Sequence, residues 1–438
     1  MQLDSLRVLI ISPHFPPVNT ADMQRVRMLL PFFRENGWQA EVLAVLPEQV
    51  AAPTDDWLLG GLPDDVPIHR VDALGLAWSR IPGLGSLGFR ALHAIKKAGD
   101  HLLRHKKFDL IYFSTTVFDA HLLGPGWKKE FSVPFVMDYQ DPWVNEYYRE
   151  HPEIPPPGGH IKYKIIDVLH RWSEPRVLKH CSGITSVSES YPKQLKTRYP
   201  WLEKLPVLVQ AFCGAESDFH RLGNADNGNT HFAKSDGSIH WVYVGVMVPM
   251  MEFSLRCFFR ALQCSSDEQL KKNLKIHFIG TSYAPAGQGK PTVAAIAAEY
   301  GLEGMVDEQC NRVPYSQALN YLKNADALLA FGTDDLGYTA SKIYPYLLAR
   351  RPLLAIFNQN SSVVELLDNV GGGVSVPFIN EEAIDSVAKR IDQHWLKQQQ
   401  YAITKPLEEK AFLPYSDFGC AKELSAFFLS VLDNSRKQ

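Results

Sequence analysis

The chain has 438 residues, of which 45% are hydrophobic and 21% charged, and its formal net charge is -3. This length favours two soluble globular domains over a single core, and the small net charge gives no reason to expect a nucleic acid partner. No apolar run approaches the roughly 18 residues that cross a bilayer, and the N-terminus lacks the pattern of a signal peptide, so we expect a cytoplasmic protein.

Five short apolar runs in the first half have the pattern of parallel strands that are covered on both faces. Each is five or six residues long and apolar at consecutive positions, with many β-branched and aromatic residues. They are RVLIIS (7–12), AEVLAV (40–45), DLIYF (109–113), PFVMD (134–138) and GITSV (183–187). Helical stretches between them predict a doubly wound α/β domain.

The first helix is predicted over residues 22–37, where apolar residues recur at helical spacing and Gly37 suits the stop. Pro31 should kink or shorten this helix. Arg25 lies close to the end of the first strand. It could reach an acidic group or a phosphate of a ligand, and a surface ion pair is the alternative.

The segment MDYQDPWVNEYY follows a predicted buried strand and combines carboxylates with aromatic rings. Asp138, Asp141 and Glu146 could accept hydrogen bonds from sugar hydroxyls while Trp143 stacks on a sugar ring. The alternative is a structural turn in which an aspartate caps a helix.

A basic cluster lies on a predicted helix upstream of this segment. It is either a solvated helix face or a peripheral contact to anionic lipid. Its members are Lys96, Lys97, Arg104, Lys106 and Lys107.

The alternation of strands and helices restarts near residue 239, after the polar, glycine- and asparagine-rich segment 223–238. The strands of the second half are predicted in IHWVYVGV (239–246), KIHFIG (275–280), DALLAF (326–331) and PLLAIF (352–357). We expect two doubly wound, Rossmann-like domains, at 1–215 and 216–405, whose strand ends face a shared cleft. Residues 406–438 should form a helix that packs back across them.

Familiar cofactor and metal patterns are missing from the sequence. The six cysteines form no CxxC pair, and the fifteen histidines are dispersed. APAGQGKPT (284–292) departs from a P-loop, and no GxGxxG follows the first strand. We therefore expect no cofactor and no metal.

The stretch GYTASKIYPYLLARRPLLAIF (337–357) reads as a helix followed by a strand, with Pro345 inside the helix. Proline is tolerated in the first turn, where backbone N–H groups have no partner. Pro345 therefore marks a helix start, and Ser341 suits the cap. The free N–H groups and the ammonium of Lys342 then form an anion site that fits a phosphate. The alternative is an ordinary capped helix with an exposed lysine.

Several segments, taken in order, resemble the family-4 glycosyltransferases, which have the two-domain GT-B fold. They are VLIISPHFPPVNTADMQRVRMLLPFFRENGWQAEVLAV (8–45), FVMDYQDPW (135–143), SVSESYPKQLKTRYP (186–200), GAESDF (214–219) and TASKIYPYLLARRPLLAIF (339–357). The resemblance covers nearly the whole chain.

The resemblance implies transfer of a sugar from a nucleotide diphosphosugar, with retention at the anomeric carbon and without a metal. It places the nucleotide in the second domain and the acceptor in the first. Asp141 and Asp138 fall near the place where the first domain meets the donor sugar. The donor-binding residues that it implies, together with the nearby Arg25, are Gly245, Arg312, Val313, Thr339, Ser341 and Lys342.

The sequence also departs from the family pattern. The usual pair of glutamates would fall at Gly337 and Pro345, so Asp334 or Asp335 could substitute, with a solvated turn as the alternative. No basic residue follows the strand at Gly245.

These observations predict a retaining, metal-independent glycosyltransferase of bacterial type that acts on a cell-surface glycan or a lipid-linked acceptor at the inner face of the membrane. The alternatives are a GT-B-like sugar-nucleotide epimerase and a catalytically inactive protein that binds a sugar or nucleotide.

Overall fold

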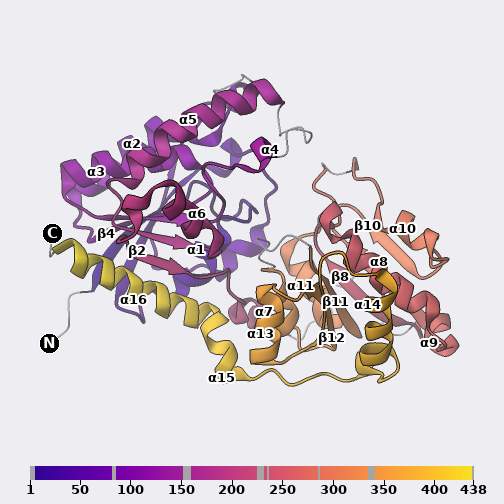
Figure 1. Ribbon diagram of the computed structural model, residues 1–438. Coiled ribbons are helices and arrows are strands. Elements are labelled where there is room, and N and C mark those ends of the chain that lie inside the picture. The colour runs from indigo at the N-terminus through magenta and orange to yellow at the C-terminus, as the bar shows by residue number, and fades with distance from the viewer. Residues whose placement is uncertain are drawn as a thin grey trace. The chain divides into compact units, whose positions relative to one another are not determined.

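The computed structural model describes residues 5–80, 85–150, 159–223, 231–233, 236–284, 287–333 and 341–436. Contacts divide the chain into two units (Figure 1). Unit 1 comprises Met1–Cys213 together with Asp417–Gln438, and unit 2 comprises Gly214–Ser416. The chain thus leaves unit 1 at residue 213 and returns to it at residue 417. The expected C-terminal segment, 406–438, is therefore shared between the two units.

The described part of unit 1 contains a sheet of seven parallel strands in the order β3-β2-β1-β4-β5-β6-β7. All five predicted strands are present. The strands β3 and β7 were not predicted because they are short and only partly buried. The strands are β1 Leu6–Ile11, β2 Trp38–Val45, β3 Ile68–Val71, β4 Leu110–Ser114, β5 Phe135–Tyr139, β6 Gly183–Ser186 and β7 Val207–Val209.

Helices cover both faces of this sheet, with α2 and α3 on one side and α16 on the other (Figure 1). The predicted helix over 22–37 is divided as Pro31 requires: α1 stops at Leu29 and a 3₁₀ turn continues over Leu30–Phe32. The helices of unit 1 are α1 Gln24–Leu29, α2 Leu87–His105, α3 Gly124–Phe131, α4 Tyr147–Glu150, α5 His160–Leu178, α6 Ser190–Arg198 and α16 Asp417–Arg436.

The C-terminal helix α16 completes the core of unit 1. Phe428 is fully buried, and its ring packs edge-on against Trp38 at 5.4 Å and Tyr112 at 5.0 Å between ring centroids. Leu424 and Leu432, on the same side of the helix, are also buried. The helix therefore packs against the first sheet, whose contacting residues lie more than 300 positions earlier in the chain.

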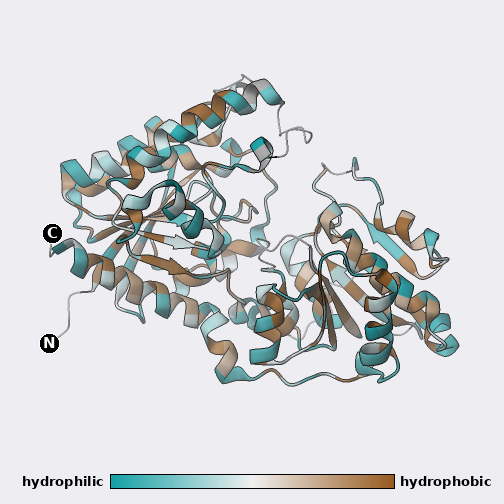
Figure 2. Ribbon diagram, in the orientation of Figure 1, coloured by the Kyte–Doolittle hydropathy of each residue, from teal (hydrophilic) through white to brown (hydrophobic). Residues whose placement is uncertain are grey.

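The described part of unit 2 has a sheet of six parallel strands in the order β10-β9-β8-β11-β12-β13. In both sheets the strands are mostly hydrophobic (Figure 2). The edge strand β10, VDEQ, was not predicted because its two carboxylates hide the apolar pattern. The strands are β8 Ile239–Val244, β9 Leu274–Ile279, β10 Val306–Gln309, β11 Ala327–Phe331, β12 Leu353–Asn358 and β13 Val374–Phe378.

The helices of unit 2 also lie on both faces of their sheet, α8 and α14 on one side and α11 and α13 on the other (Figure 1). They are α7 Glu216–Leu222, α8 Glu252–Cys264, α9 Glu268–Asn273, α10 Val293–Glu299, α11 Tyr315–Asn324, α12 Ile343–Leu348, α13 Ser362–Val370, α14 Ile384–Ile391 and α15 Glu409–Phe412. The prediction of two Rossmann-like α/β domains is therefore confirmed. No helix in the described ranges combines the length and the apolar character that a membrane crossing needs.

Candidate functional site

In unit 2 the start of α12 lies against the carboxyl end of β8. Pro345 is the third residue of α12, inside the first turn, as predicted. The cap prediction for Ser341 is wrong: Lys342 occupies the N-cap position, and no side chain makes a cap hydrogen bond. The hydroxyl of Tyr346 accepts a hydrogen bond from the backbone N–H of Val244 at 2.7 Å and donates to its carbonyl at 3.0 Å, which holds α12 against β8.

The side chain of Lys342 reaches the loop that follows β8. Its Nζ donates to the carbonyl oxygen of Val246 at 3.2 Å and lies 5.6 Å from the ring centroid of Tyr243. Gly245 has φ +141°, and a Cβ at this position would collide with the end of the Lys342 side chain. The backbone conformation therefore favours glycine at this position, and the side chain of Lys342 lies close against it. No basic residue directly follows β8 in the sequence, but Lys342, at the start of α12, brings an ammonium group to the loop after β8.

Lys342 is poised to bind an anion. Burial, reinforced by the positive charge of Arg312, lowers the pKa of the Lys342 ammonium to about 8. In the part of unit 2 that the structure describes, no carboxylate forms an ion pair with it. Because α12 has only six residues, we attribute the attraction for an anion mainly to the charge of Lys342 and less to the helix N-terminus.

Arg312 and Val313 follow β10, at the same end of the sheet as Gly245. Arg312 is exposed and Val313 partly buried. The Cα of Arg312 would lie 3.9 Å from a Cβ placed on Gly280, the residue after β9. The structure thus gathers Gly245, Arg312, Val313 and Lys342 at the carboxyl ends of β8, β9 and β10, which we call the Lys342 site. Of the other predicted residues, Asp334, Asp335, Gly337 and Thr339 lie outside the described residues.

In unit 1 a histidine and an aspartate pair at the carboxyl ends of β1 and β4. The buried carboxylate of Asp22 lies 2.8 Å from His14 Nδ1 and accepts hydrogen bonds from the hydroxyls of Thr115 at 3.1 Å and Thr116 at 3.2 Å. Burial alone would raise the pKa of Asp22, but the hydrogen bond and charge of His14, together with hydrogen bonds from neighbouring threonines, lower the pKa to about 2. Asp22 is therefore ionised and orients the imidazole.

His14 keeps its second ring nitrogen available. Nε2 has no hydrogen-bond partner among the described residues, and 17% of the side-chain surface is exposed. A neutral imidazole that is oriented by a carboxylate can accept a proton or a hydrogen bond at its outer nitrogen. The sequence analysis missed this pair. The available signal was a histidine directly after the first strand with an aspartate eight positions later.

Asp141 follows β5 in the same unit and differs from Asp22 in its electrostatics. Its surface is accessible, yet protein atoms surround the carboxyl closely. The resulting desolvation and the negative charge of Asp22 raise the pKa of Asp141 to about 6. The two carboxylates thus titrate far apart, an arrangement that is common in acid–base sites. We call His14, Asp22 and Asp141 the His14 site.

Two predicted site residues of unit 1 are buried beneath this surface. Asp138 accepts hydrogen bonds from the hydroxyls of Ser114 and Thr185, both at 2.8 Å, and forms an ion pair with Arg25 Nε at 2.8 Å. Arg25 also donates to the side-chain and backbone oxygens of Gln210, at 3.1 and 2.7 Å. Both residues are almost fully buried. The structure therefore corrects the expectation that they contact a ligand, because a buried ion pair needs its partners for its own stability.

Trp143 and Glu146, which follow Asp141 in the sequence, also contact other side chains of unit 1. Trp143 is buried and stacks on Phe118 at 5.7 Å between ring centroids, so its face is not available to a sugar. Glu146 forms an ion pair with Arg171 at 2.6 Å. Of this predicted sugar-binding segment, Asp141 is the residue that keeps an accessible carboxyl.

An exposed apolar face lies on α5. The four side chains that form it are each more than half exposed and are spaced at i, i+3, i+4 and i+7, so they share one side of the helix. The guanidinium of Arg176 lies 3.9 Å from the Trp172 ring centroid and extends this side. The residues of the α5 face are Ile165, Val168, Leu169 and Trp172.

Three of the five residues of the basic cluster, which lies on α2 and just past its end, form ion pairs within unit 1. Lys96 pairs with Asp100 at 2.6 Å, Arg104 with Glu130 at 2.6 Å, and Lys106 with Glu41 at 2.7 Å. These pairs favour the solvated-face interpretation of the cluster.

No protein-family model and no curated protein matches the chain by sequence. Solved structures match it in fold over almost its full length. A glycosyltransferase from Rickettsia africae has a TM-score of 0.58 at 12% identity, covering 99% of this chain and 100% of that one. HepE from Anabaena in complex with UDP and glucose has a TM-score of 0.55 at 15% identity, covering 97% and 99%.

The N-terminal domain of the trehalose-6-phosphate phosphatase from Candida albicans has a TM-score of 0.60 at 12% identity and covers 97% of both chains. At such low identity these matches concern the fold. The two parallel-sheet α/β units have the GT-B fold of glycosyltransferases.

Proposed function

We propose that this protein transfers a sugar from a nucleotide diphosphosugar to a glycan or lipid-linked acceptor. One observation carries the proposal: the partly buried ammonium of Lys342 meets the carboxyl end of β8, near the charge of Arg312 and without a carboxylate partner in the described part of unit 2. A diphosphate supplies the negative charge that such a site lacks.

Unit 2 binds the donor in this proposal. Lys342 contacts the diphosphate, and Gly245 lets the backbone and the lysine approach each other closely. Ser341 stands next to Lys342 and offers a hydroxyl, while Arg312 and Val313 lie where a base could rest on the loop after β10. The comparison with Anabaena HepE supports this assignment, since that protein was solved with UDP and glucose.

Unit 1 binds the acceptor. His14 Nε2 and the carboxyl of Asp141 are the accessible polar groups at the carboxyl ends of β1 and β5, and both can accept a hydrogen bond from a sugar hydroxyl. Retention at the anomeric carbon and transfer without a metal belong to the proposal through the resemblance to family 4. In this proposal the His14 site orients the acceptor hydroxyl.

The α5 face suggests where the acceptor comes from. Apolar side chains with a tryptophan and flanking basic residues, here Lys164 and Arg176, suit the interface of a membrane that contains anionic lipid. The proposal therefore places the protein at the inner face of a membrane, in the cytoplasm, with a lipid-linked acceptor. The six free cysteines accord with a reducing compartment.

A panel of nucleotide sugars with and without membrane-extracted acceptors tests the proposal. Nucleotide release that needs acceptor indicates transfer, and NMR of the product then reports whether the anomeric configuration is retained. Activity that survives EDTA establishes independence from divalent metal. A changed sugar nucleotide without acceptor would indicate an epimerase, and binding without turnover would indicate an inactive binding protein; either result overturns the proposal.

A further inference from the structure

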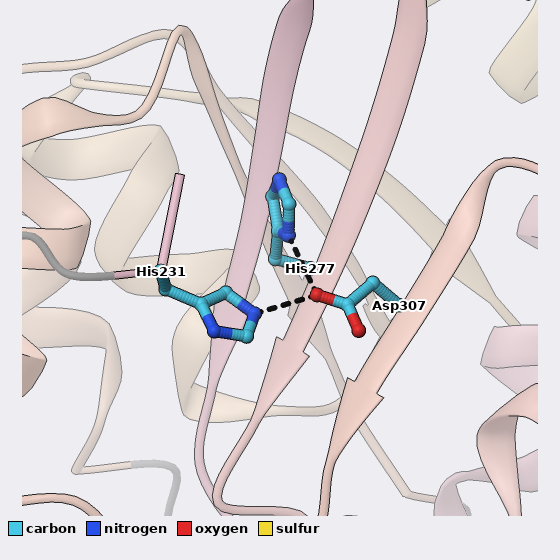
Figure 3. Close-up of side chains that lie close together, drawn as sticks. All are labelled: His231, His277 and Asp307. Atoms are coloured by element: carbon cyan, nitrogen blue, oxygen red, sulfur yellow. Dashed lines mark hydrogen bonds and ion pairs between the residues drawn. The ribbon is translucent and has the colours of Figure 1, made fainter. Parts of the chain in front are cut away.

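Two histidines from different parts of unit 2 lie close to the same carboxylate oxygen of Asp307 (Figure 3). His231 Nε2 lies 2.6 Å and His277 Nδ1 lies 3.2 Å from the same oxygen of Asp307. The three potential ligand atoms all lie within 4.8 Å of one another. His277 is buried, whereas 53% of the Asp307 side chain is exposed. The group therefore has a buried side and a side open to solvent.

The sheet brings these residues together. His277 is opposite Asp307 in the pairing of β9 with β10, and Val242 is opposite His277 in the pairing of β8 with β9. His240, two positions before Val242, therefore projects from the same face as His277. The ring of Phe232 stacks on both His240 and His277, at 4.7 and 4.9 Å between centroids, which places the segment 231–233 over this face.

A second layer of hydrogen bonds stands behind His277. Its Nε2 lies 3.0 Å from His240 Nδ1, and His240 Nε2 lies 3.1 Å from Asp236 Oδ1. The imidazoles of His240 and His277 thus make a chain of three hydrogen-bond contacts that runs from Asp236 to Asp307. A neutral imidazole carries one N–H, so two neutral rings supply a hydrogen for only two of the three contacts.

From this hydrogen count and the clustered ligand atoms, we propose that His231, His277 and Asp307 bind a divalent transition-metal cation of the Zn²⁺ type. With the cation on His277 Nδ1, the Nε2–H of His277 donates to His240, and the Nε2–H of His240 donates to Asp236. Every contact is then satisfied with neutral rings. A metal-bound histidine usually donates its other N–H to such an outer partner.

The ligand set selects the class of ion. Two imidazole nitrogens and one carboxylate suit Zn²⁺ and its neighbours, whereas Mg²⁺ and Ca²⁺ prefer oxygen ligands. Tetrahedral bonds of about 2.1 Å place ligand atoms roughly 3.4 Å apart. The 3.2 Å contact is close to that value, and the exposed Asp307 has room to withdraw from His231. Solvent at Asp307 provides the fourth ligand.

The position of the group indicates a structural role for the ion. His240 and Asp307 are the second residues of β8 and β10, whereas the Lys342 site lies at the carboxyl ends of these strands. The ion would pin the segment 231–233 to β9 and β10 without touching a donor. The site is therefore compatible with sugar transfer that needs no metal.

The test uses the full chain without a histidine tag, stripped of metal by chelation. Titration with ZnCl₂ in a calorimeter, and metal analysis after dialysis, should give one ion per chain. His231→Ala and Asp307→Asn should each weaken binding at least tenfold while the metal-free proteins keep the circular dichroism and melting temperature of the wild type. Asp307→Asn keeps the side-chain shape, so it separates ligand loss from misfolding.

His101 and His105 provide the matched control, because they stand four residues apart on the surface of α2 and could bind zinc by themselves. The double variant His101→Ala/His105→Ala should keep the wild-type affinity. Co²⁺ in place of Zn²⁺ should give visible bands of a four-coordinate nitrogen and oxygen site without a thiolate charge-transfer band. The proposal would be overturned by absence of binding, by binding that survives both ligand variants, or by a thiolate band. If no metal binds, a charged imidazole between Asp236 and Asp307 accounts for the hydrogen-bond contacts instead.

Discussion

At the scale of single residues, Lys342 makes the sharpest prediction. Lys342→Met removes the ammonium and keeps most of the side-chain volume. A charged hydrogen bond contributes on the order of 1.5–3 kcal/mol, so a nucleoside diphosphate should bind roughly 10- to 150-fold more weakly. The nucleoside without phosphates should bind as before. Calorimetric titration with both ligands measures the difference, and equal losses for the two would contradict the assignment.

The pKa of Lys342 predicts how diphosphate binding varies with pH. Because the pKa of the free protein's Lys342 is lowered to about 8, the ammonium loses its proton as the pH rises through 8. Diphosphate affinity should therefore be highest below pH 8 and fall above it. Phosphate groups are already ionised in this range, since their second pKa is near 6. Lys342→Met should lose this dependence, whereas Lys275→Met, which changes an exposed lysine at the start of β9, should retain it.

Asp141 makes a second prediction at this scale, for stability and turnover together. Its pKa is raised from 3.8 to about 6, so the folded state holds the proton more tightly than the unfolded state, and stability falls as the pH rises from about 4 to 6. Asp141→Asn should lose that fall and be more stable than the wild type above pH 6. The variant should bind nucleotide normally and lose turnover. Denaturant melts at pH 4.5 and 7.5 check the first part, and full activity would remove Asp141 from the site.

At the scale of secondary-structure elements, α5 carries an apolar face that is exposed to solvent. Exposed apolar patches on this scale mark contacts with a membrane or another protein. The double variant Val168→Asp/Trp172→Ser should lose binding to vesicles that contain anionic phospholipid and keep its fold. Flotation with the vesicles measures binding. Leu429→Ser, which changes an exposed leucine on α16, serves as the control. Unchanged flotation of the double variant would leave the α5 face without a membrane role.

At the scale of the whole molecule, the first unit is discontinuous in sequence, because α16 returns to it after unit 2. Phe428 fills the space between Trp38 and Tyr112. Phe428→Ala should therefore cost about 3–5 kcal/mol of the free energy of unfolding, through a cavity in the core. Hydrogen exchange should show lost protection in β1, β2 and β4 while β8, β9 and β11 keep theirs. Loss in both sheets would mean that the units do not unfold separately.

The local sequence pattern predicted a strand or a helix end correctly where a single physical requirement governs that element. The consecutive apolar residues of RVLIIS and DALLAF suit only buried strands, and proline chemistry located the end of α1 and the start of α12. The order of these elements predicted two doubly wound α/β domains, and the resemblance to family 4 implied the GT-B fold. The edge strand β10 was not predicted, because the two carboxylates in VDEQ interrupt the run of apolar residues that marks a buried strand.

Only the tertiary structure decided which polar residues are accessible. Asp138 and Asp141 stand three positions apart in one motif, yet one is buried beside Arg25 and the other keeps an accessible carboxyl. Likewise His277 and Asp307 meet because parallel strands place residues 30 positions apart side by side. The sequence by itself determined the buried strands and the helices between them, since these depend on neighbours along the chain, but it did not reveal the edge strands β3, β7 and β10. Burial, charge pairing and pKa depend on neighbours in space, and the packing of the sheets and helices settled them.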